Sequence, residues 1–192
     1  MAKRIEQLEK DKLQLQADLR ALTLREAASN HDASHDALTG LPNRILIRDR
    51  FQQAAARAER FRTQLIVLFL DLDQFKQVND SFSHAVGDRV LQMVAGRISA
   101  IIRATDTACR YGGDEFVVLL TALDEAARPD AIVQNMKKQL ARPCRIGSFR
   151  IALQASIGAA VYPSDGMAWE HLLAHADAAM YRAKGATANS AS

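Results

Sequence analysis

The chain has 192 residues, of which 48% are hydrophobic and 24% are charged, and its net charge is +3. This composition excludes a disordered protein and suits one globular domain with an appendage. The Lys and Arg residues form no basic run with interleaved aromatic residues, so we expect no nucleic-acid surface. Two cysteines make no disulfide framework, and we find neither a signal peptide nor an apolar run of membrane length. We therefore expect a cytoplasmic protein with no direct membrane contact.

Residues 1–32 form a separate region with a heptad pattern of apolar residues. The a and d positions are occupied by Ile5, Leu8, Leu15, Leu19 and Leu22, with Lys12 at one seam position. The flanking residues are polar or charged helix formers, and the apolar stripe is narrow. This pattern predicts an N-terminal helix that forms a parallel two-stranded coiled coil and makes the protein a homodimer. A single amphipathic helix lying on the following domain is the alternative.

The next elements are a helix and a buried strand. Gly40 and Pro42 interrupt the first helix, and Asn43 is a suitable N-cap for a second helix that ends near Arg60. Residues 65–70 are a continuous apolar run, which is typical of a central strand covered on both faces. This strand ends in Asp71-Leu72-Asp73. We expect Asp71 to be a metal ligand and Asp73 to make a loop or cap contact.

A second pair of acids lies farther along the chain. Strand-forming runs at 108–111 and 116–120 flank Gly112-Gly113-Asp114-Glu115, and this pattern predicts a hairpin with two carboxylates at its tip. Taken alone, a solvated turn explains this stretch equally well. Together with Asp71, these acids indicate a Mg²⁺ site, because Mg²⁺ takes one or two carboxylates and completes its shell with water and phosphates. Two such ions can activate an attacking oxygen and stabilise a leaving one.

The remaining pattern completes an α+β fold. We expect helices at 85–102, 124–141 and 168–184, a turn at 146–148 and a strand at 149–161. The order β-α-β-β-α-β predicts a mostly antiparallel sheet flanked by helices. His171 and His175 are four residues apart on the last helix. Without a third ligand nearby, a solvated or packing role is favoured over a metal pair.

The sequence resembles the GGDEF family of diguanylate cyclases over residues 33–189. Six segments carry the resemblance in the family's order, namely His35–Arg44, Asp71–Asp80, His84 with Gly87-Asp88, Arg110–Phe116, Ala155–Gly158 and Ala176–Lys184. The resemblance implies the fold of nucleotide cyclases and polymerase palms. It also implies a bacterial enzyme that condenses two GTP into cyclic di-GMP and two pyrophosphates. Such an enzyme acts as a homodimer, uses two Mg²⁺ or Mn²⁺ ions per active site, and is joined by its N-terminal helix to an upstream sensor outside this chain.

The resemblance also implies roles for single residues. Asp71 and Asp114 hold the metals together with the carbonyl of Leu72, and Asp114 or Glu115 deprotonates or orients the attacking 3′-hydroxyl. Substrate-binding positions are Lys76 and Lys184 for the phosphates, Asn79 and Asp88 for the guanine edge, and His84, for which a structural role is an equal alternative.

Arg103 and Asp106 match the family's product-binding inhibitory motif. A surface ion pair that closes a helix is the alternative for these two residues. The chain also departs from the family twice, because Ser83 replaces a glycine and Ala188 replaces an arginine that contacts phosphate. We expect Ser83 to be strained if its φ is positive, and substrate binding to be weakened by the absence of the arginine.

Two other functions remain possible on the sequence. The first is a catalytically silent module that binds GTP or cyclic di-GMP, and the intact acidic motif argues against it. The second is a general adenylyl cyclase or polymerase-palm enzyme with the same metal chemistry. Asn79 and Asp88 together disfavour it, since an amide and a carboxylate suit guanine better than adenine.

Overall fold

The structure is a computed structural model that describes residues 4, 12, 14–16, 18–23, 31, 33–124 and 126–189, without the side chains of 186–189. The chain divides into two compact units, 1–35 and 36–192. In the first unit, the described residues before position 32 are helical, and Leu15, Leu19 and Leu22 are more than half exposed. Ile5 and Leu8 of the heptad seam lie outside the described residues. The coiled coil and the homodimer therefore stay predictions.

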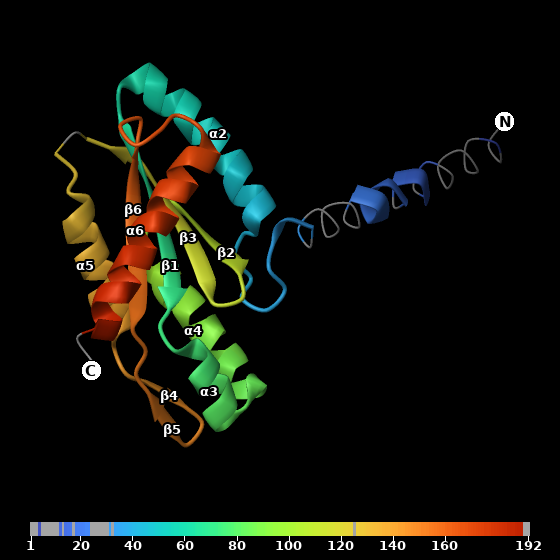
Figure 1. Ribbon diagram of the computed structural model, residues 1–192. Coiled ribbons are helices and arrows are strands. Elements are labelled where there is room, and N and C mark those ends of the chain that lie inside the picture. The colour runs from blue at the N-terminus through green and yellow to red at the C-terminus, as the bar shows by residue number, and fades with distance from the viewer. Residues whose placement is uncertain are drawn as a thin grey trace. The chain divides into compact units, whose positions relative to one another are not determined.

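The second unit is built on a four-stranded antiparallel sheet with the order β2-β3-β1-β6 (Figure 1). The strands are β1 (Gln64–Leu72), β2 (Thr107–Gly112), β3 (Glu115–Leu123) and β6 (Ala155–Tyr162). β1 lies in the centre and pairs with β3 on one side and β6 on the other. Residues 65–70 of β1 are all buried. The predicted α+β class and the central strand are confirmed.

Helices cover both faces of this sheet, as Figure 1 shows. α2 (Arg44–Phe61) and α6 (Trp169–Asn189) pack on the face that contains Leu65, Val67 and Phe69. α3 (Phe75–Phe82), α4 (His84–Ile101) and α5 (Pro129–Leu140) pack against the face that contains Ile66, Leu68 and Leu70. Successive residues of a strand point to opposite faces, so one continuous apolar run supplies both cores.

Two local features fix the helices that position the site. The Asn43 side chain accepts hydrogen bonds from the backbone N–H groups of Ile45 (2.9 Å) and Leu46 (3.2 Å), so the predicted N-cap of α2 is confirmed. At Gly158 of β6, an added Cβ would lie 2.0 Å from the carbonyl oxygen of Ala176 and 2.2 Å from the nitrogen of Met180. Only glycine lets the backbone of α6 approach the sheet this closely.

Two predictions of secondary structure are wrong, and one helix was not predicted. The helix expected at 124–141 begins only at Pro129, which has no N–H and suits the first helical turn. The strand expected at 149–161 is broken into β5 (Phe149–Ile151) and β6. β5 instead forms a separate hairpin with β4 (Cys144–Ile146), because Gly147 adopts a left-handed φ of 61° between them. The eight-residue helix α3 was not predicted.

Candidate active site

Strand register brings the predicted acids together at the C-terminal end of β1. Asp71 of β1 lies opposite Glu115 of β3 in the antiparallel ladder. The N–H of Leu72 donates a hydrogen bond to the carbonyl oxygen of Asp114 at 3.3 Å. The predicted hairpin is confirmed: Gly112 pairs with Glu115, and Gly113, with φ 49°, and Asp114 form the turn between them.

Lys184 reaches this acidic cluster from the last helix. Its Nζ lies 2.6 Å from Oδ1 of Asp71, although 113 positions separate the two residues in the sequence. The Asp71 side chain is 13% exposed and the Lys184 side chain is 44% exposed. This hydrogen bond raises the pKa of Lys184, so the ammonium group is charged at neutral pH.

The cluster has more negative charge than its basic neighbours neutralise. Burial, together with the charge of Asp71, raises the pKa of Asp114. Burial also raises the pKa of Glu115, and the charges of Asp71, Asp114 and Asp177 add to this rise. Carboxylates that repel one another in a half-buried site are well suited to a divalent cation, which relieves the repulsion.

The donor set fits Mg²⁺ only if the substrate completes it. In the described part of the chain, no group of three or more His, Cys, Asp or Glu side chains could hold a metal ion by itself. Mg²⁺ in phosphoryl-transfer sites takes one or two carboxylates and receives its other ligands from water and phosphates. Asp71, Asp114 and the carbonyl of Leu72 meet this requirement. His171 and His175 are both exposed, in agreement with a solvated role.

Arg110 links the hairpin to Asp36, which lies in the segment that precedes α2. Its guanidinium donates to both carboxylate oxygens of Asp36 (3.2 and 3.1 Å) and to the carbonyl oxygen of Gly113 (3.0 and 2.8 Å). Burial opposes ionisation of Asp36, but hydrogen bonds from Thr39 and from Arg110 hold its pKa below the usual range. This link joins two motifs that lie 74 positions apart, and local sequence patterns do not predict it.

The predicted guanine-binding residues lie where α3 meets α4. A Cβ on Gly87 would lie 1.9 Å from Oδ1 of Asn79, so the side chain of Asn79 rests against the first turn of α4. Asp88 follows Gly87 directly and is exposed, as are Lys76 and His84. The structure therefore groups Asn79 and Asp88 on neighbouring helices and leaves the other two side chains open to solvent.

Ser83 joins these two helices in a strained conformation. Its φ is 140° and its ψ is 162°, a region that glycine adopts and other residues avoid. The carbonyl of Ser83 accepts the N–H groups of Val86 and Gly87, both at 3.1 Å. The condition under which we expected strain at this position is therefore met.

The predicted inhibitory motif forms the turn between α4 and β2. The carboxylate of Asp106 accepts the N–H of Arg103 (2.9 Å) through Oδ2 and the N–H of Thr121 (2.9 Å) through Oδ1. Asp106 therefore closes the turn through backbone groups, and an Arg103–Asp106 ion pair is not among the salt bridges of the described residues. The Arg103 side chain is exposed.

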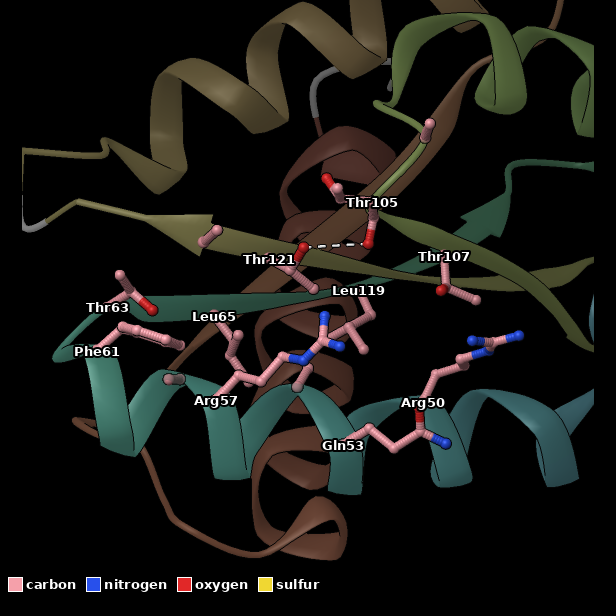
Figure 2. A pocket seen from close by; sticks show the side chains of 14 residues that line it. Arg50, Gln53, Arg57, Phe61, Thr63, Leu65, Thr105, Thr107, Leu119 and Thr121 are labelled. Atoms are coloured by element: carbon pink, nitrogen blue, oxygen red, sulfur yellow. Dashed lines mark hydrogen bonds between the residues drawn. The ribbon is translucent and has the colours of Figure 1, made fainter.

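A cavity of about 450 Å³ adjoins this turn, between α2 and strands β2 and β3. Figure 2 shows Arg50 and Arg57 of α2 on one side of the cavity and Thr105, Thr107 and Thr121 on the other. The hydroxyl of Thr121 donates to the carbonyl of Thr105 at 3.1 Å. The cavity combines two cationic side chains with hydroxyl groups, a suitable environment for an anionic, polar ligand.

Residues 33–190 match the family model described as diguanylate cyclase, GGDEF domain. The chain belongs to the GGDEF domain family. This confirms the resemblance inferred from the six motifs. The GGDEF domain is 47% identical over 152 residues to the bifunctional diguanylate cyclase/cyclic di-GMP phosphodiesterase MucR of Pseudomonas aeruginosa, covering 79% of this chain and 22% of MucR. It is 42% identical to the diguanylate cyclase TpbB of the same species, covering 82% of this chain and 37% of TpbB.

Solved structures agree with this assignment. The coiled coil and GGDEF domain of DgcB from Caulobacter crescentus, in complex with c-di-GMP, is 27% identical and superposes with a TM-score of 0.81, covering 93% of this chain and 95% of that one. The chain spans much less than half the length of MucR and TpbB. No helix of the described residues is long and apolar enough to cross a membrane.

Proposed function

We propose that this GGDEF domain is a diguanylate cyclase, which condenses two GTP into cyclic di-GMP and releases two pyrophosphates. The observation that carries the proposal is the strand register that sets Asp71 opposite Glu115 and beside the Asp114 turn, with Lys184 at the same acids. The names of MucR and TpbB support the same activity. The alternative of an adenylyl cyclase or polymerase-palm enzyme is disfavoured, because the amide of Asn79 and the carboxylate of Asp88 together suit guanine better than adenine.

The residues of the chain then have distinct tasks. Asp71, Asp114 and the carbonyl of Leu72 would hold Mg²⁺ or Mn²⁺. Such ions, when bound, supply positive charge to the triphosphate and lower the pKa of the attacking hydroxyl. Lys184 and Lys76 hold the phosphates, and they do so without the arginine that Ala188 replaces.

Proton transfer falls to the acids of the hairpin. Asp114 or Glu115 accepts the proton of the 3′-hydroxyl or orients this hydroxyl for attack. The two acids share a site with Asp71, so they titrate as a coupled group and not singly.

Each domain supplies half of the reaction. Because one domain holds one GTP, the 3′-hydroxyl of each GTP attacks the α-phosphorus of the other in a homodimer with two facing sites. The N-terminal helix raises the effective concentration of one domain near the other, and it would connect the domain to an upstream sensor. Most of the barrier is lowered by positioning and charge neutralisation, as in other phosphoryl transfers.

Cyclic di-GMP would also inhibit the enzyme at the turn of Arg103 and Asp106. Arg103 is exposed, and the adjoining cavity contains further cationic side chains. Asp106 uses its carboxylate for two backbone N–H groups, but an ionised carboxylate has room for additional donors. Arg103→Ala is the cleaner test, because Asp106→Ala would also open the turn. We expect inhibition by added cyclic di-GMP to weaken about tenfold or more in Arg103→Ala.

The decisive experiment incubates the purified chain with GTP and Mg²⁺ and separates the nucleotides by chromatography. We expect cyclic di-GMP and pyrophosphate from the wild type, and about a 100-fold or greater loss in Asp114→Asn. Asp49→Asn, which removes an exposed acid of α2, is the matched control and should retain activity. Near-wild-type turnover in Asp114→Asn would refute the site. A wild type that stays silent after removal of co-purified cyclic di-GMP, and that binds this nucleotide tightly, would be a receptor.

A further inference from the structure

The active site contains a cation of its own. Lys184 lies 2.6 Å from a carboxylate oxygen of Asp71, the residue with which we expect a metal ion to interact. The other cation close to the acids, Arg110, is committed to Asp36 and to the carbonyl of Gly113. Lys184 is therefore the side chain that balances the charge of Asp71 in the described structure.

The position of Lys184 allows its ammonium group to leave Asp71 and contact a different negatively charged group. The backbone of α6 is held close to β6 at Gly158, so the Cα of Lys184 has a fixed place beside the acids. The Lys184 side chain is 44% exposed, and its four-carbon stem lets the ammonium group swing between neighbouring partners. A bound triphosphate offers such a partner, with more negative charge than one carboxylate.

We propose that Lys184 is a placeholder cation, which neutralises Asp71 in the nucleotide-free protein and transfers to the triphosphate when substrate binds. This inference rests on the proposed function for the identity of the metal and the nucleotide. An ammonium group on Asp71 repels a divalent cation and competes with it for the same oxygen. Departure of Lys184 to the phosphates removes both obstacles. Metal and nucleotide therefore bind cooperatively, and each raises the affinity of the protein for the other by the same factor.

The test measures Mn²⁺ binding to the full chain by the electron paramagnetic resonance signal of free Mn²⁺. Without nucleotide, we expect Lys184→Met to bind Mn²⁺ about 5- to 150-fold more tightly than the wild type, the usual range of coupling between sites. Lys184→Arg keeps the charge and should stay close to wild type. Arg182→Met removes an exposed cation from the same helix and is the control for net charge. Lys184→Gln is a second neutral variant, and circular dichroism confirms that each variant is folded.

The same titration with saturating 3′-deoxy-GTP, which has no attacking hydroxyl, should reverse the order. Lys184 then contacts phosphate, so Lys184→Met should bind Mn²⁺ and nucleotide more weakly than the wild type. The placeholder role is overturned if both neutral variants bind Mn²⁺ alone no more tightly than the wild type, or if Arg182→Met tightens binding equally. Turnover of GTP is scored separately. If Lys184→Met and the wild type show this reversal of Mn²⁺ affinity but the wild type forms no cyclic di-GMP, the cyclase activity is refuted and the placeholder role of Lys184 still holds.

Discussion

Ser83 offers a sharp test of the backbone between the two helices of the nucleotide site. With φ 140° and ψ 162°, it occupies a region in which a non-glycine residue stores about 1–3 kcal/mol of strain. Glycine at this position relieves the strain, but it gives the unfolded chain additional freedom worth about 0.5–1 kcal/mol. The difference predicts that Ser83→Gly stabilises the protein by up to about 2.5 kcal/mol.

Thermal and urea unfolding of the two proteins measure this difference directly. For a domain of this size, about 1 kcal/mol raises Tm by about 2–4 °C. Ser81→Gly is the matched control, because Ser81 is exposed within α3 and glycine there should destabilise the helix by about 0.5–1 kcal/mol.

If Ser83→Gly lowers Tm as much as Ser81→Gly does, the serine is not strained and its side chain supports the junction between α3 and α4. Cyclic di-GMP formation should persist in Ser83→Gly, since the substitution restores the glycine that the family has at this position.

Three further predictions concern the site and the elements that position it. Asp114→Asn should raise the Tm of the ligand-free protein at pH 7, because burial raises the pKa of Asp114 and the charge of this residue therefore opposes folding. The gain in Tm should vanish below the usual pKa of 3.8, where the carboxyl group is neutral in both the folded and the unfolded state. A lower Tm at pH 7 would contradict the prediction. Gly158→Ala should destabilise the protein by about 1–3 kcal/mol or more and reduce cyclic di-GMP formation, because α6 and Lys184 must move to make room for the new Cβ. Gly96→Ala is the control, because no atom lies within 4 Å of its new Cβ, and it should not destabilise the protein in the same unfolding assay. Asp36→Asn should destabilise by about 1–2 kcal/mol at neutral pH. The pKa of Asp36 is held below its usual value of 3.8, so the charged side chain stabilises the folded state above that pH and loses this effect as the pH falls further. The difference in the free energy of unfolding between mutant and wild type, measured in urea, should therefore disappear toward pH 2. A difference that persists at pH 2 would exclude the charge of Asp36 as its cause.

The errors in predicted secondary structure concern short elements, whose extent and strand pairing cannot be inferred from the local spacing of apolar residues. The continuous pattern from 149 to 161 conceals a change of partner, since β5 pairs with β4 and β6 pairs with β1. The eight residues of α3 form only about two helical turns, so the helical spacing of Phe75 and Val78 is too short a pattern to predict a helix.

The central strand, the Asn43 cap, the acidic hairpin, the family and the position of the replaced glycine could all be predicted from the amino-acid sequence. The local features depend on residues close together in the chain, whose spacing sets burial, capping and turn geometry, whereas the family follows from the order of six short motifs along the chain. The contacts between distant side chains, such as Lys184 with Asp71 and Arg110 with Asp36, could not be predicted from the sequence and are seen only in the folded protein. The physical reason is that these contacts depend on strand register and on the close approach of α6 at Gly158, and both arise from packing across the whole sheet.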